Sequence, residues 1–239
     1  MERIGRLLTF PTPARLLTDA EALERDRRSK LVGGRDIRLE RIRRSGIGAH
    51  LGPGDAGRIV RDQVSDTPAM RLVSQWADPQ RDVARRWLML TGTVGVGKTM
   101  AAAWLLARDG GRYVTMTDLV RMYSPILRGL APQTQDDALA RLDALARSQT
   151  LVLDELGRDG LSPEVAREAL HWLVEARHGA RRGRTLVLSN ISAADLRRRF
   201  SDGTYDARTE SRLRPLLARR QDGTGIHEIA GRDMRGAPL

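Results

Sequence analysis

The amino-acid sequence predicts an α/β domain built on a doubly wound, mostly parallel sheet of five strands. Two observations lead to this prediction. From Asp66 onward, short apolar runs alternate with longer segments of helical periodicity. A complete glycine-rich motif also separates the first predicted strand from the helix that follows it. This alternation indicates a parallel sheet, because parallel neighbours need a crossover connection that is usually a helix.

The individual elements follow from the same patterns. The predicted strands are short, apolar and rich in leucine and valine, at residues 87–90, 111–117, 150–153, 185–188 and 226–230. The predicted helices carry apolar residues at helical spacing, at residues 67–77, 100–108, from 118 onward, 136–147 and 163–177. One sizeable core with a smaller appendage is what 239 residues can hold.

The composition restricts the classes of function. The chain has no cysteine, which excludes disulfides, thiolate zinc sites and cysteine catalysis. Its apolar runs are too short for a membrane span or a signal peptide, so we expect a cytoplasmic protein. A formal net charge of +11 favours an acidic polymer such as nucleic acid as partner, over a basic surface that is merely solvated.

The first 65 residues differ from the rest and are predicted to form a basic arm or a small partner-binding module. Basic residues outnumber acidic ones over 25–44, and glycine and proline interrupt the segment 46–54. A helix is expected over 19–28, with Thr18 as its N-cap. The alternative is a tail without a special role. Residues 66–239 are expected to form the main domain.

The glycine-rich motif is a full G-x-x-x-x-G-K-[ST] phosphate-binding loop. Its glycines let the backbone wrap a phosphate, Lys98 reaches the β- and γ-phosphate oxygens, and the Thr99 hydroxyl binds Mg²⁺. Lys30 is the only other lysine of the chain. A chance glycine turn is the alternative, but the order of strand, loop and helix favours ATP binding. The expected nucleotide-binding residues are Gly92, Thr93, Val94, Gly95, Val96, Gly97, Lys98, Thr99 and Met100.

Polar residues follow two later strands. Asp154 and Glu155 come directly after the third strand, at the edge where ligands bind in such sheets. We expect Asp154 to bind Mg²⁺ together with Thr99, and Glu155 to polarise the attacking water. Asn190 follows the fourth strand, where its amide could contact the γ-phosphate or that water. The alternatives are a helix-capping acidic pair and an ordinary turn asparagine.

These motifs together resemble the AAA+ ATPases, in particular the bacterial and phage helicase loaders of the DnaC type and the related transposition ATPases of the IstB type. The resemblance covers about residues 66–235 and does not include the arm. It implies that Arg212, in Ser211-Arg212-Leu213, completes the ATP site of a neighbouring subunit in a homo-oligomer. Arg208 and Arg214 are the alternatives. The few residues after Arg212 imply a truncated lid.

The same resemblance places an extra helical insertion at residues 118–128. In that family the insertion faces single-stranded DNA, so Arg121 and Arg128 would contact phosphates while Tyr123 would stack on a base. The alternative is an ordinary amphipathic helix that buries Leu119, Met122 and Ile126.

The function that we expect is therefore that of a Mg²⁺-dependent ATPase in DNA replication. It would load a replicative hexameric helicase onto single-stranded DNA, with slow ATP turnover. The alternative is an IstB-like regulator that polymerises on duplex DNA and recruits a transposase. A third possibility is a nucleotide-gated DNA-binding adaptor without turnover.

Overall fold

The computed structural model describes residues 33–78, 87–157, 162–179, 183–201 and 225–231. The chain divides into two compact units, Met1–Asp36 and Ile37–Leu239, and the elements named below lie in the second. The predicted arm helix over 19–28 and the expected truncated lid fall outside the described residues.

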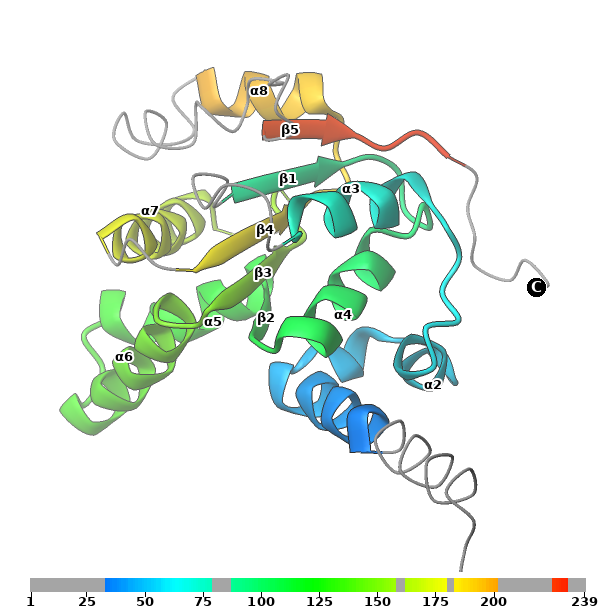
Figure 1. Cartoon of the computed structure of the whole chain (residues 1–239). Helices are drawn as coiled ribbons and strands as arrows, with labels where there is room; N and C mark the ends of the chain where they lie inside the picture. Colours follow the sequence, from blue (N-terminus) through cyan, green and yellow to red (C-terminus); the bar gives the residue numbers. More distant parts are fainter. Residues whose placement is uncertain (1–32, 79–86, 158–161, 180–182, 202–224, 232–239) are drawn as a thin grey trace, which may run out of the picture. The chain divides into compact units, whose positions relative to one another are not determined.

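Five strands form one parallel sheet, as predicted (Figure 1). Their order across the sheet is β2-β3-β4-β1-β5, so the first strand of the sequence lies next to the outermost position. Each strand lies within about two residues of its predicted position: β1 (Trp87–Thr91), β2 (Arg112–Thr115), β3 (Thr150–Asp154), β4 (Arg184–Leu188) and β5 (Gly225–Glu228). The registers pair Leu90 with Leu188 and Leu153 with Val187, so the carboxyl ends of β1, β3 and β4 lie side by side.

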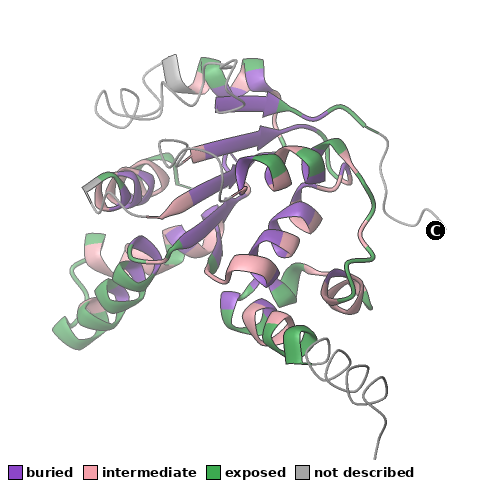
Figure 2. Ribbon diagram, in the orientation of Figure 1, coloured by how far each residue is buried: buried purple, intermediate pink, exposed green. Residues whose placement is uncertain are grey.

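Helices cover both faces of the sheet, and side-chain alternation along the strands fills both cores (Figure 2). Along β1, Leu88 and Leu90 enter one cluster while Met89 enters the other. The first cluster includes residues of η1 (Ile47–His50), α2 (Asp55–Val60), α3 (Pro68–Trp76) and α4 (Lys98–Asp109). The second includes residues of α5 (Met116–Leu127), α6 (Pro132–Ala146), α7 (Pro163–Gly179) and α8 (Ala193–Ser201).

The end of β2 and the start of α6 differ from their predicted positions for local reasons. The second strand was expected to run to residue 117, but it ends at Thr115 because that side chain caps the next helix. The Thr115 hydroxyl accepts a hydrogen bond from the Asp118 N–H at 3.1 Å, so α5 starts at Met116. The helix predicted from residue 136 starts at Pro132, a residue well suited to a first helical turn.

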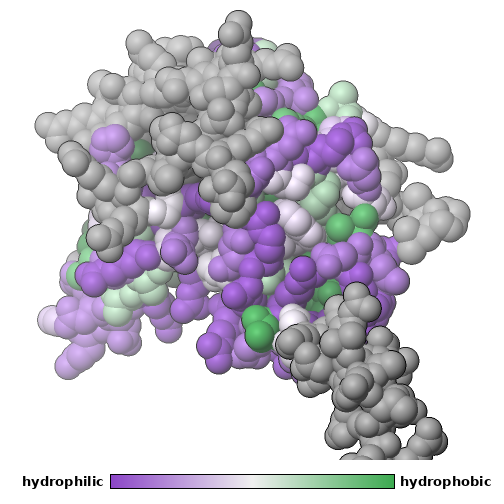
Figure 3. Space-filling model, in the orientation of Figure 1, coloured by the Kyte–Doolittle hydropathy of each residue, from purple (hydrophilic) through white to green (hydrophobic). Residues whose placement is uncertain are grey.

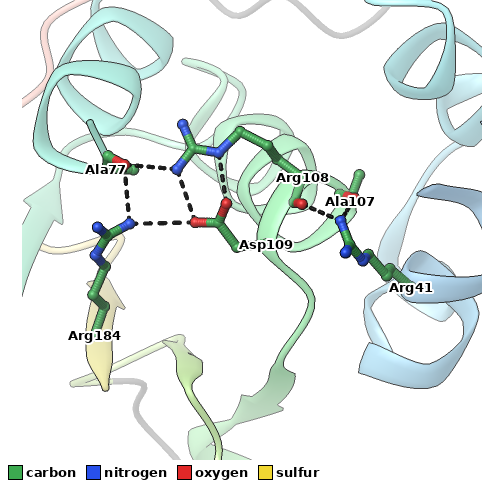
Figure 4. Close-up of polar contacts among 6 residues, drawn as sticks. All are labelled: Arg41, Ala77, Ala107, Arg108, Asp109 and Arg184. Carbon is green, nitrogen blue, oxygen red and sulfur yellow. Dashed lines mark hydrogen bonds and ion pairs between the residues drawn. The ribbon is translucent and has the colours of Figure 1, made fainter. Parts of the chain in front are cut away.

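The compact unit that contains the sheet begins at Ile37, whereas the sequence predicts a boundary after residue 65. Residues 37–45 are helical, and Ile42, Ile47 and Ile59 are buried in the same cluster as the α4 face of the sheet. Arg41 donates hydrogen bonds to carbonyl oxygens at the end of α4 (Figure 4). Residues 37–65 are therefore part of the α/β unit.

A polar network lies at the amino ends of the strands, on the edge of the sheet opposite to the glycine-rich loop. Arg108 and Arg184 both donate to the carbonyl oxygen of Ala77 and both pair with Asp109 (Figure 4). This arrangement joins the ends of α3 and α4 to the start of β4. Arginines there serve the architecture, since their guanidinium groups satisfy carbonyl oxygens that the helix ends leave without a partner.

Candidate functional site

The phosphate-binding loop connects β1 to α4 at the carboxyl edge of the sheet. Gly92, Gly95 and Gly97 have φ angles of 136°, 88° and 90°, which favour glycine. A Cβ atom at Gly92 would overlap the carbonyl oxygen of Ile229, just beyond β5. A Cβ atom at Gly97 would lie 3.1 Å from the Thr67 hydroxyl oxygen. The loop conformation is thus set by packing against β5 and the start of α3.

Lys98 lies inside this loop. Its ammonium group donates hydrogen bonds to the carbonyl oxygens of Gly92 and Thr93, both at 2.8 Å. Only 5% of the residue is exposed. Burial lowers the pKa of Lys98, while the nearby Asp154 carboxylate raises it. The loop therefore presents a compact positive charge next to the N-terminus of α4, where the first N–H groups have no intrahelical acceptor.

Thr99 and Asp154 come together as expected for two magnesium ligands. The Thr99 hydroxyl donates to Oδ2 of Asp154 at 3.3 Å. The N–H of Glu155 donates to Oδ1 of the same carboxylate at 2.6 Å, and Glu155 has a φ angle of 60°. One hydroxyl and one carboxylate are hard oxygen ligands that suit Mg²⁺, which keeps several waters when it binds to proteins. The residues present therefore fit this ion bound with a nucleotide.

Tyr113 is a member of the site that the sequence analysis missed. Its hydroxyl donates to Oδ2 of Asp154 at 2.9 Å, and its ring lies 4.7 Å from that of His50. Burial and the Asp154 carboxylate raise the pKa of Tyr113, so its hydroxyl stays protonated and can donate. Side-chain alternation along β2 could have predicted this contact, because Thr115 pairs with Asp154 and Tyr113 lies two residues earlier on the same face of the sheet. The prediction would, however, require knowing that β2 is the neighbour of β3.

A cleft of about 400 Å³ lies beside the loop. Its walls come from α3, α8 and the segment 226–230. Two contacts place it next to the loop: Thr67, which precedes α3, adjoins Gly97, and Ile229 adjoins Gly92. The lining residues combine apolar with polar side chains: Pro68, Leu72, Ala193, Arg197, Ile226, His227, Glu228, Ile229 and Ala230. The sequence alone did not indicate this cleft.

Of the other two predicted catalytic residues, Asn190 and Arg212, the structure describes only Asn190. Asn190 is exposed and follows β4, whose end is aligned with the ends of β1 and β3. Ser189, immediately before it, donates its N–H to the Leu90 carbonyl oxygen at 2.9 Å, which holds this edge together. Arg212 and its alternatives, Arg208 and Arg214, lie outside the described residues.

The proposed DNA-contacting residues lie on or next to α5. Arg121 and Arg128 are exposed, and Arg121 lies 3.7 Å from the Asp118 carboxylate. Tyr123 is half-buried, and burial raises its pKa. The amphipathic interpretation is confirmed, since Leu119 is buried and the other two apolar residues of that face, Met122 and Ile126, pack against the core. DNA contact through the exposed side remains a prediction.

Membrane-spanning helices and clusters of metal ligands are both absent from residues 33–78, 87–157, 162–179, 183–201 and 225–231. None of the helices there is long and apolar enough to cross a membrane. The same ranges contain no group of three histidine, aspartate or glutamate side chains that could hold a metal ion by themselves.

The fold has counterparts among solved structures. DnaI matches over 71% of this chain and 89% of its own, with a TM-score of 0.52 and 21% sequence identity. The DnaC helicase loader matches over 80% of this chain and 99% of its own, with a TM-score of 0.46 and 20% identity. The replication initiator DnaA, bound to AMPPCP and single-stranded DNA, matches over 72% of this chain and 49% of its own, with a TM-score of 0.49 and 15% identity. No protein-family model and no curated protein sequence matches this chain. The chain thus shares the fold of DnaI, and the predicted α/β fold with one parallel five-stranded sheet is confirmed.

Proposed function

We propose that this protein binds ATP with Mg²⁺ and hydrolyses it. The observation that carries the proposal is the placement of Lys98 inside a glycine loop, with Thr99 and the pair Asp154 and Glu155 beside it. A cation, helix N–H groups, two hard oxygen ligands and a second carboxylate are the parts that phosphoryl transfer to water needs.

Each residue has a defined role in this proposal. The loop backbone and the first turn of α4, including Met100, bind the phosphates, and Lys98 neutralises their charge. Thr99 and Asp154 would hold Mg²⁺, which neutralises developing negative charge on the phosphates when it is bound. Glu155 orients the attacking water and accepts its proton. Asn190, at the adjacent strand end, donates its amide to that water or to the γ-phosphate.

The cleft beside the loop suits the nucleoside part of ATP. Leu72 and Ile226 offer apolar contacts for a base, and Glu228 offers a hydrogen-bond acceptor in the lining of the cleft. The position next to Gly92 and Gly97 fits a ligand whose phosphates occupy the loop.

We further infer a role in DNA replication, as a factor that loads a replicative helicase onto single-stranded DNA. Support comes from the resemblance of the motifs to helicase loaders, from the fold shared with DnaI, and from the net charge of +11. Hydrophilic side chains predominate among the coloured residues on the face shown in Figure 3. In this role Arg121, Tyr123 and Arg128 contact DNA. Arg212 completes the ATP site of the next subunit in a homo-oligomer.

Nucleotide binding is tested first, with the two lysines as a matched pair. Lys98→Ala should weaken binding of a fluorescent ATP analogue by about 100-fold or more, because the loop loses its only charged side chain. Lys30→Ala should bind as the wild type does. Thermal unfolding without nucleotide shows whether Lys98→Ala is folded. Equal affinity of a folded Lys98→Ala and the wild type would overturn the assignment of the loop.

The cellular role is tested by DNA binding and assembly, each with and without ATP. ATP-dependent binding to single strands in short oligomers, weakening steeply with salt, supports the helicase loader. Long ATP-dependent filaments on duplex DNA would instead support the transposition regulator. DNA affinity that does not change with salt would contradict an electrostatic role of the basic charge.

A further inference from the structure

The carboxylate of Asp154 accepts hydrogen bonds from Thr99, at the end of the glycine-rich loop, and from two donors outside that loop. Its Oδ1 accepts the Glu155 N–H, and its Oδ2 accepts both the Thr99 hydroxyl at 3.3 Å and the Tyr113 hydroxyl at 2.9 Å. Thr99 is itself a predicted magnesium ligand, and its contact is the longer of the two on Oδ2. Tyr113 is thus the donor that fixes this oxygen from outside the loop.

The position of Tyr113 is set by two neighbours. The pairing of β2 with β3 places Tyr113 opposite Val152, two residues before the end of β3. The residue is only 9% exposed, and its ring lies against the ring of His50 at an interplanar angle of 49°. A phenol held in this way loses little freedom when its hydroxyl binds a carboxylate, which makes it an effective orienting group.

His50 belongs to a segment that packs along β2. Arg112, the first residue of β2, donates a hydrogen bond to the Arg44 carbonyl oxygen at 3.0 Å. A Cβ atom at Gly46 would lie 3.7 Å from the Tyr113 carbonyl oxygen. The chain from Arg44 to His50 therefore lies against β2, and His50 is its contact with the tyrosine ring.

We propose that Tyr113 is a positioning residue for magnesium, orienting the Asp154 carboxylate, and that His50 holds Tyr113 in place. The inference rests on the proposed function of the loop. Its consequence is a physical connection between the segment 44–50 and the metal site. A change that moves His50 away from Tyr113 lowers the affinity for Mg²⁺, and with it the Mg²⁺-dependent binding of ATP.

The test measures Mg²⁺ dependence rather than turnover. Binding of a fluorescent ATP analogue is followed while MgCl₂ is titrated, and again in EDTA without Mg²⁺. Tyr113→Phe keeps the ring and removes the donor, so we expect the Mg²⁺ concentration for half-maximal binding to rise about tenfold, the lower end for loss of a group that supports a metal ligand. Nucleotide affinity in EDTA should not change, because the phenol does not support the loop itself.

His50→Ala provides a second, independent variant at an exposed position. It should raise the half-maximal Mg²⁺ concentration in the same direction, by roughly threefold, since it loosens the ring without removing the hydroxyl. His178→Ala, a matched exposed histidine on α7, should behave as the wild type does.

The outcomes separate the two proposals. If the wild type shows Mg²⁺-dependent binding and Tyr113→Phe and His50→Ala have the wild-type half-maximal concentration, the positioning role is overturned while the ATP site stands. Equal losses with and without Mg²⁺ would show a merely structural role and would also overturn it. If the wild type binds no nucleotide, the proposed function fails and this inference fails with it.

Discussion

Replacing Arg177 by methionine should destabilise the protein strongly, although this residue lies far from the loop. Arg177 lies in the last turn of α7 and is 4% exposed. Burial lowers its pKa to about 10, so the guanidinium remains charged at neutral pH. It donates to acceptors at the end of α6, in the connection to β3 and at the start of β4: the carbonyl oxygens of Leu145, Ala146, Ser148 and Arg184, and the Thr185 hydroxyl oxygen.

The size of the effect follows from these contacts. Methionine nearly fills the same volume, so the cost comes from acceptors that lose their donor, at about 1–3 kcal/mol each when they stay buried. The Leu145 carbonyl oxygen keeps donors from Ser148, and water can reach some of the others. We therefore expect a loss of about 3–5 kcal/mol, which corresponds to about two of these neutral acceptors staying buried without a donor. This is a large part of a typical total stability of about 5–15 kcal/mol.

Urea unfolding of the two variants Arg177→Met and Arg147→Met provides the measurement. Arg147 is 80% exposed in its side chain and pairs with Asp143 across one helical turn. Such a pair contributes about 0.5 kcal/mol or less. Arg177→Lys should lie between the two, because an ammonium group has only three donors. A free energy of unfolding for Arg177→Met within about 1 kcal/mol of that for Arg147→Met would refute the reasoning.

Three further outcomes are expected. Gly92→Ala should lower the free energy of unfolding by about 2–4 kcal/mol even without nucleotide, because its Cβ overlaps Ile229; an unchanged thermal midpoint would contradict this. Glu155→Gln should retain ATP binding and lower the rate of phosphate release by about 100-fold or more, whereas a rate equal to that of the wild type would favour the nucleotide-gated adaptor. Arg212→Ala should bind ATP but turn over slowly, and mixing it with Lys98→Ala should restore some activity; absence of recovery argues against action across subunits.

Much of the candidate site could be predicted from short motifs that each follow a strand. The strand, loop and helix around Lys98 follow one another directly, so their order and the placement of the loop at the sheet edge were readable from the motif. Asp154 and Thr99 were assigned to one metal because both motifs end at the same edge, and the structure brings them within 3.3 Å. In each case the inference needed only the rule that parallel strands end together.

Features that depend on the order of strands were not predictable. The contact between Tyr113 and Asp154 exists because β2 neighbours β3, and the sequence gives the strands but not their order. The cleft beside the loop likewise combines α3 with β5, elements far apart in the chain. Gly92 illustrates a related limit: the motif explains it by phosphate binding, whereas the structure adds the close approach of Ile229.

The boundary of the domain depends on isolated apolar residues rather than on charge. Residues 37–65 were assigned to the arm because basic residues and glycines dominate there, yet Ile42, Ile47 and Ile59 are each at most 1% exposed. Burying an isoleucine side chain stabilises by about 1.5–3 kcal/mol, so the three together contribute roughly 5–9 kcal/mol. That sum is comparable to the whole stability of a domain. A fragment that begins at residue 66 would therefore lack the residues that cover the α4 face of the sheet, and we expect it to fold poorly. The same segment carries His50 to Tyr113, which means that the residues that complete the core also contact the proposed magnesium site.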